Sequence, residues 1–183
     1  MNIKASTNAT LVTIVSASLL LSACGRAGRE AESRTRDVGI RTPLGDLSVR
    51  TDIDGRETGL PLYPGAQPVR DANEGDGARV TIATPLFGFD VVAAKYESAD
   101  ATDLLIEFYR REMRTYGDVV ECRGDVDFKA RRGGRLPTCN QNPTAQEVKL
   151  IVGTENRHRL VSVMRRGSGS EFSIVYIHAR ENP

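Results

Sequence analysis

The chain has no tryptophan, few other aromatic residues and almost no net charge. Phe and Tyr make up 5% of its 183 residues, so Val, Ile, Leu and Ala must supply most of any core. The formal net charge is +1. Lys4 is the only charged residue among the first 23, which leaves 24 basic and 24 acidic side chains in the rest of the chain. Without a charge excess there is no overall field to attract a polyanion, so we expect no nucleic-acid partner.

The apolar run near the N-terminus is too short to cross a bilayer. Residues 10–21 are uncharged over about 12 positions, whereas a spanning helix needs about 20. After the positive Lys4, such a run is typical of a signal peptide, here residues 1–23. The sequence Leu21-Ser22-Ala23-Cys24 resembles the lipobox of bacterial lipoproteins, which implies cleavage before Cys24 and diacylglycerol, with palmitate-like acyl chains, on its thiol. An ordinary signal peptide with an incidental cysteine is the alternative.

Residues 24–39 are polar and charged, which predicts a flexible tether between Cys24 and a single domain at residues 40–183. Several acyl chains make a firm anchor. The lipobox resemblance therefore implies a protein held on a membrane of the cell envelope, facing the periplasm or the exterior. Gly25 is not the aspartate that retains some proteobacterial lipoproteins in the inner membrane, which favours the outer membrane in an organism that has one.

The residues after 40 predict an α+β domain, an antiparallel β-sheet with one main α-helix packed on a face. Apolar and polar alternation predicts strands at 47–53, 79–84, 89–96, 119–122, 147–153, 159–164 and 172–178. In the first of these, Leu47, Val49, Thr51 and Ile53 are expected to share one face. The last strand is apolar on both faces, so we expect it near the centre of the sheet.

The helix is expected over about residues 101–116, with Ser98 or Asp100 capping its start and Gly117 ending it. Apolar side chains recur at helical spacing and predict the face that packs on the sheet. These residues are Leu104, Leu105, Phe108, Met113 and Tyr116.

With Cys24 lipidated, Cys122 and Cys139 remain as an even pair in an oxidising compartment, which predicts a disulfide. A two-residue turn at Gly133-Gly134 would pair residues whose numbers sum to 267, whereas 122 and 139 sum to 261. The cysteines are therefore not expected to be cross-strand neighbours, and the intervening loop is expected to be irregular or a hairpin centred elsewhere. A metal-binding or redox pair is the alternative, although redox cysteines are normally closer in sequence.

The loop between the two cysteines is basic and is the sequence's best candidate for a binding surface, since loops often carry function. An acidic protein, a lipid headgroup or a polyanionic glycan would fit it, and a solvated loop without a partner is the alternative. With the neighbouring turn, the candidate surface comprises Tyr63, Arg123, Lys129, Arg131, Arg132 and Arg135.

No motif predicts catalysis or a cofactor. His158 and His178 lie at predicted strand ends without a third ligand at metal-site spacing, and are interpreted as surface histidines. Asp52 begins a segment that looks like a calcium loop, but Tyr63 occupies the twelfth position, where the glutamate belongs. We therefore expect no metal, no cofactor and no catalytic residue.

Two motifs together resemble a recurrent unit of bacterial lipoproteins and secreted proteins that has no assigned reaction. They are Gly59-Leu-Pro-Leu-Tyr-Pro-Gly-Ala66 and, in the helix, Glu107-Phe-Tyr-Arg110 with Tyr116-Gly117 after it. The similarity covers residues 42–122. The resemblance assigns no activity. Packing of Tyr63 in the turn against Phe108 in the helix would explain both motifs without a ligand.

These observations favour a membrane-anchored envelope lipoprotein with a non-enzymatic interaction or scaffolding domain, bound to the membrane through Cys24. The alternative is an envelope protein that binds a small ligand or a glycan. A hydrolase is less favoured, because no catalytic constellation is recognisable. A deep polar pocket would favour the ligand or enzyme hypotheses, and an exposed apolar sheet face would favour a protein partner.

Overall fold

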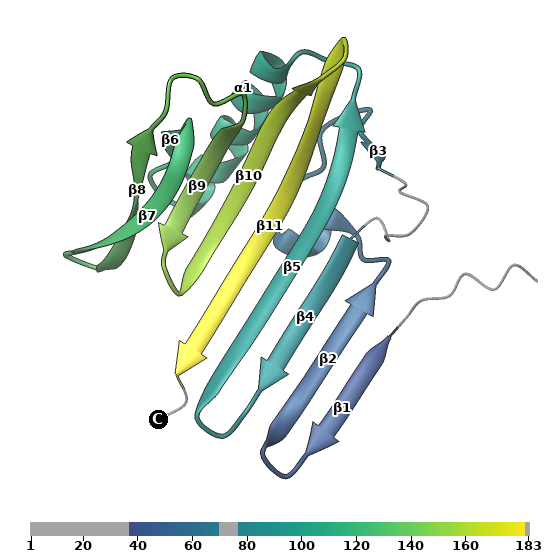
Figure 1. Ribbon diagram of the computed structural model, residues 1–183, viewed down its shortest axis with the longest axis vertical. Coiled ribbons are helices and arrows are strands. Elements are labelled where there is room, and N and C mark those ends of the chain that lie inside the picture. The colour runs from purple at the N-terminus through teal and green to yellow at the C-terminus, as the bar shows by residue number, and fades with distance from the viewer. Residues whose placement is uncertain (1–36, 70–76, 182–183) are drawn as a thin grey trace, which may run out of the picture. The chain divides into compact units, whose positions relative to one another are not determined.

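Antiparallel β-strands dominate the computed structural model, which describes residues 37–69 and 77–181 (Figure 1). The predicted signal peptide and the lipidation site at Cys24 lie outside these residues. The predicted tether is too long at its C-terminal end, because Val38 and Gly39 already belong to a strand. No helix within the described ranges is long and apolar enough to span a bilayer.

The described residues contain a nine-stranded sheet with the order β1-β2-β4-β5-β11-β10-β9-β6, and the short β3 pairs with β5. Every pairing is antiparallel. The strands are β1 (Val38–Thr42), β2 (Gly45–Thr51), β3 (Gln67–Pro68), β4 (Gly77–Ala83), β5 (Phe87–Ser98), β6 (Val120–Cys122), β9 (Val148–Thr154), β10 (Arg157–Arg166) and β11 (Gly169–Glu181). The α+β class is confirmed, with more strand than predicted. The central place of the last strand is also confirmed, because β11 lies between β5 and β10.

A separate hairpin was not predicted as such. It consists of β7 (Gly124–Arg131) and β8 (Gly134–Gln141), which turn through Arg132 and Gly133. The expectation of an irregular loop is therefore wrong, and its alternative, a hairpin centred away from Gly133-Gly134, is correct. The first strand, β1, was missed as well.

The helix α1 (Thr102–Met113) lies on one face of the sheet, in contact with β9 and β10, and ends in a 3-10 turn, η2 (Arg114–Tyr116). Its buried side chains are Leu105, Ile106, Tyr109 and Met113. The predicted face was wrong by part of a turn. Leu104 is 51% exposed and Tyr116 is 41% exposed, because the buried stripe runs through positions 105, 109 and 113 at intervals of four.

The predicted caps at the start of α1 are not formed. The N-cap residue is Ala101, which makes no side-chain capping bond. Asp100 instead accepts a hydrogen bond from the Tyr63 hydroxyl over 2.7 Å, and Ser98 accepts one from the Asp100 backbone N–H.

The core lies between α1 and one end of the sheet. Tyr96 of β5 stacks on Phe172 of β11, and Phe172 also packs against Tyr109 of α1. The segment after β2, which includes the 3-10 helix η1 (Gly55–Thr58), closes the core beside Leu60. No helix of the described residues lies at the other end of the sheet.

The backbone at Asp52 explains why the first predicted strand ends early. Asp52 has φ of 65°, the only positive value of a non-glycine residue in the described ranges. Beyond it Ile53 is buried in the core under α1, whereas Leu47 and Val49 lie on the opposite face of the sheet. The prediction that Ile53 shares a face with Leu47 and Val49 was therefore wrong.

Candidate interaction surface

Burial alternates along β5 and shows which side of the sheet is covered. Val92 and Ala94 are 0% and 3% exposed and face the core beneath α1. Val91 and Ala93 point to the opposite side and are only half-buried. Successive side chains of a strand point to opposite faces of the sheet. The cross-strand register therefore shows which residues of the neighbouring strands lie on the α1 side and which on the opposite side.

Beyond the helix, the α1 side of the sheet is polar. Arg79 of β4 binds Asp90 of β5 through two parallel hydrogen bonds of 2.9 and 2.6 Å, and Thr81 donates to the same carboxylate. Arg79 also binds Glu57 of η1 over 3.1 Å. Burial alone would raise the pKa of Asp90, but the bonds from Arg79 and Thr81 and the charges of Arg79 and His178 lower it.

The opposite side of the same strands is apolar, and no described element covers it. We call it the open apolar face. Three cross-strand rows make it up, defined by the registers of six strands from β1 to β10, together with Phe87 one row further along β5. Its residues are Val38, Ile40, Leu47, Val49, Ala78, Val80, Ile82, Phe87, Phe89, Val91, Ala93, Leu160, Val175, Ile177 and Ala179. All of these residues are half-buried or exposed.

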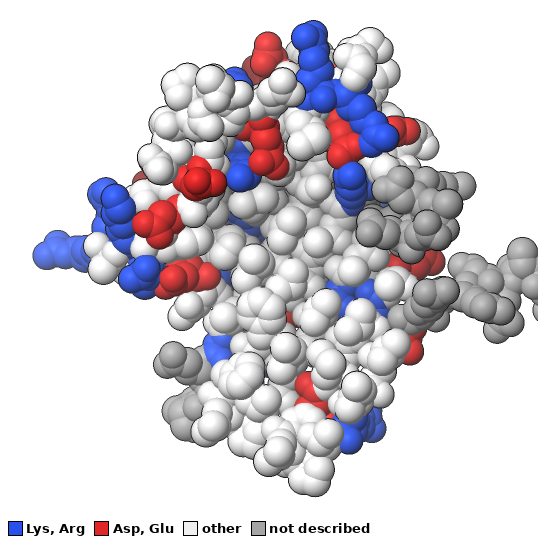
Figure 2. All heavy atoms as spheres, viewed as in Figure 1, with Lys and Arg blue, Asp and Glu red and all other residues white. Residues whose placement is uncertain are grey.

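The open apolar face has a sharp polar border. The next row of the sheet pairs Lys95 with Ser173 and Ser173 with Ser162. One row further, Glu171 is bound by Lys95 and by Arg166. Figure 2, viewed from this side, shows mostly uncharged surface over β11, β5 and β4, with most charged residues above and to the left and a few at the right and lower edges.

A depression of about 280 Å³ lies at the end of the open apolar face nearest the β4–β5 turn. Ile82, Phe87, Phe89 and Ala179 contribute to its lining. Phe87 is 47% exposed there, and Leu86 in the turn is 77% exposed. Single exposed apolar side chains are common, but a contiguous exposed apolar patch is typical of a docking surface.

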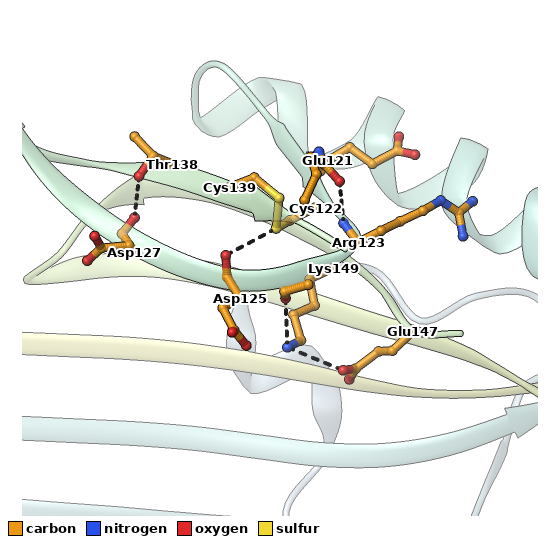
Figure 3. The surroundings of a disulfide bond; sticks show 11 residues. Glu121, Cys122, Arg123, Asp125, Asp127, Thr138, Cys139, Glu147 and Lys149 are labelled. Atoms are coloured by element: carbon orange, nitrogen blue, oxygen red, sulfur yellow. Dashed lines mark hydrogen bonds and ion pairs between the residues drawn. A yellow bond between two sulfur atoms is a disulfide. The ribbon is translucent and has the colours of Figure 1, made fainter. Parts of the chain in front are cut away.

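The β7–β8 hairpin covers the other end of this side of the sheet, over β9 and β10. A disulfide joins Cys122 in β6 to Cys139 in β8 with a Cα–Cα distance of 5.3 Å, which confirms the predicted pair (Figure 3). Cys139 pairs with Val126 across the hairpin, so the two cysteines are not cross-strand neighbours, as predicted. Lys149 of β9 donates to the Gly124 carbonyl over 3.2 Å and fastens the hairpin further.

The basic residues of the predicted binding surface all lie on or beside this hairpin. Lys129, Arg131 and Arg132 are exposed near its tip, and Arg123 is exposed at its base. Arg135 is paired with Glu155 over 2.5 Å and donates to the Phe128 carbonyl over 2.6 Å. Arg135 therefore holds the hairpin to the β9–β10 turn, and the tip carries the basic charge.

Tyr63 belongs to a different part of the molecule from the basic hairpin. Its ring packs edge-to-face on Phe108 of α1 with centroids 5.2 Å apart, which confirms the contact implied by the two motifs. Pro64 and Gly65 form the centre of a turn closed by the Ala66 N–H and the Tyr63 carbonyl, and Gly65 has the positive φ that a type II turn requires. Tyr63 thus fastens the turn to the helix.

The two histidines do not form a site. His158 is 8% exposed, so its interpretation as a surface residue was wrong. Its ring packs against Phe128 of the hairpin, with centroids 5.0 Å apart. His178 pairs with Arg157 in the register and faces the opposite side of the sheet. In the described ranges no three His, Cys, Asp or Glu residues are grouped as metal ligands.

Sequence reasoning missed the open apolar face, although a signal for it was present. Val175, Ile177 and Ala179 lie on a second apolar side of β11, and they were interpreted only as a sign of a central strand.

No protein-family model, no curated protein and no solved structure matches this chain at a significant level.

Proposed function

We propose that this protein is an envelope lipoprotein, anchored through Cys24, whose domain is a non-enzymatic interaction module that binds a protein through the open apolar face. The observation that carries the proposal is the position of this face. It lies on the side of the sheet away from α1, and two of the strands that form it, β2 and β4, carry Ser48, Arg50, Arg79 and Thr81 on the α1 side. A sheet that is apolar on one side needs a second layer against that side.

The size of the open apolar face is consistent with a protein interface. Six strands about 4.8 Å apart and three rows about 6.8 Å apart give roughly 600 Å² of flat area. A stable interface buries about 800 Å² of solvent-accessible surface per partner, and this surface is larger than the flat area beneath it because side chains protrude. The face therefore offers most of a standard interface and has no charge at its centre.

Site-specific photocrosslinking in the native envelope tests this proposal. A benzophenone amino acid in place of Val175, on the open apolar face, is expected to give a protein adduct. The same probe in place of Ser48, which lies on the polar side of β2, is the matched control. Equal, background-level crosslinking at both positions would overturn the proposal.

A further inference from the structure

We infer that the occupant of the open apolar face is a second copy of this chain, so that two sheets pack face to face around a two-fold axis. This inference rests on the proposed function and names its partner. The geometry is that of a β-sandwich, in which two sheets lie about 10 Å apart and cross at about 30° because each is twisted. Each copy would supply one layer of the sandwich.

The chemistry of the face favours self-association. A two-fold interface brings each patch against its own copy, so any charge within it meets a like charge. The three rows of the open apolar face contain no Asp, Glu, Lys or Arg residue. His158 ends the middle row in β10, where Phe128 of the hairpin packs on it, and Glu181 pairs with Phe87 one row beyond the three. Lys95 lies in the polar border and Glu171 one row beyond it, and the two are paired with each other over 2.8 Å.

The shape of the face also allows a copy to cover it. The hairpin rises over β9 at one side, and the exposed β1 edge lies at the other. A second sheet placed between these limits meets the rows formed by β2, β4, β5 and β11. Burial is greatest when the axis passes close to the centre of the patch, where Val80 of β4 pairs with Val91 of β5. Val91 would then face its own counterpart.

The N-terminal segment leaves enough length for two anchored copies. The first strand begins at Val38, so 14 peptide units separate it from Cys24. At about 3.3 Å per residue these reach up to about 46 Å when extended. Two copies in one membrane can therefore meet face to face without strain on either anchor.

Crosslinking between two tagged copies tests the inference. The full chain, with its signal peptide, is co-expressed in a bacterial envelope in two forms with different epitope tags. A benzophenone amino acid in place of Phe89 is expected to give an adduct that carries both tags, several-fold stronger than the same probe in place of Ser48. An adduct with a different envelope protein alone would overturn the inference and leave the proposed function standing. No adduct at Phe89 or at Val175 would overturn both.

Charge variants at the patch centre provide an independent arm. Val91→Glu in both copies, with the probe at Phe89, is expected to abolish the doubly tagged adduct, and so is Val91→Lys in both copies. Co-expression of the Glu form with the Lys form is expected to restore it, because opposite charges then meet near the axis. Val91 is half-buried on an uncovered face, so the folded monomer tolerates either charge. An adduct unchanged in both single-charge forms would overturn the two-fold packing.

Discussion

The backbone N–H of Tyr63 donates a hydrogen bond to the phenol oxygen of Tyr109 over 3.2 Å. Tyr109 is fully buried in α1, and its burial raises the pKa of the phenol well above the ordinary value. This bond joins the Pro64-Gly65 turn to the middle of the helix. It acts beside the ring contact between Tyr63 and Phe108, so the two motifs of the sequence meet at two adjacent points.

Tyr109→Phe removes the acceptor and keeps the ring. We expect it to lower the free energy of unfolding by about 1 kcal/mol, the usual net value of a hydrogen bond. Tyr116→Phe is the matched comparison, because the Tyr116 hydroxyl donates to the Gly59 carbonyl at an exposed position, and its loss should be smaller. Urea denaturation measures the free energy of unfolding of both variants. An equal decrease in the two would show that the buried Tyr109 bond stabilises the fold no more than the exposed Tyr116 bond.

Reduction of the disulfide should loosen the hairpin before the sheet. The bond closes a segment of 17 residues, for which the chain-entropy model gives about 3 kcal/mol. We expect Cys122→Ser with Cys139→Ser to lose about that amount, and hydrogen exchange to accelerate first in β7 and β8. Thiol titration of the denatured, unreduced mature protein should find no free cysteine; two free thiols would exclude the bond.

The sequence predicts a strand of this fold best where apolar and polar residues form a clear pattern along it. The strands β9, β10 and β11 were predicted because their apolar residues are dense and their turns are short. The β7–β8 hairpin was predicted only as the alternative to an irregular loop. Its charged and apolar residues alternate in β7, but Gly133 and Gly134 did not indicate that the turn lies at Arg132 and Gly133. The burial of His158 could not be predicted either, because Phe128 of that hairpin covers it.

The open apolar face illustrates a further limit. Apolar residues such as Leu47, Val49 and Val80 alternate with polar ones, which indicates that each strand has one apolar side. It does not indicate which side of the sheet the helix will cover. That depends on the positive φ of Asp52, where β2 ends, and on the core around Tyr109. Only the folded chain shows that the rows through Val49 and Val80 lie away from the helix.

Acid should weaken the network around Asp90. Because the pKa of Asp90 is lowered in the folded protein, its ionised form stabilises the fold above its unfolded pKa, about 3.9 for aspartate. That stability is lost as the pH falls through the folded pKa. Asp90→Asn is expected to cost roughly 1–3 kcal/mol at neutral pH, since it leaves Arg79 with a weaker partner. The difference from the natural chain should shrink below about pH 4 in denaturation at a series of pH values.

Lipidation at Cys24 should decide where the protein is found. Cys24→Ala is expected to block processing by the lipoprotein pathway or to release the protein from membranes. Fractionation and intact-mass measurement check this, and Cys139→Ser is a control that removes a cysteine without removing the anchor. An unchanged mass and an unchanged membrane fraction in Cys24→Ala would exclude the lipid anchor.

Adjacent substitutions in β5 should separate the two faces of the sheet. Val92 is 0% exposed beneath the helix, so Val92→Glu places an unpaired carboxyl group in the core and should cost at least about 3 kcal/mol. Val91→Glu places the same group on the open apolar face, and we expect a change within about 1 kcal/mol in the monomer. Denaturation at the lowest usable protein concentration measures monomer unfolding for both variants. The two side chains are chemically identical and adjacent in the strand, so a large difference between them comes from the face alone. If Val91→Glu unfolds the protein as severely as Val92→Glu, a further part of this chain covers the face, and neither a partner nor a second copy is needed there.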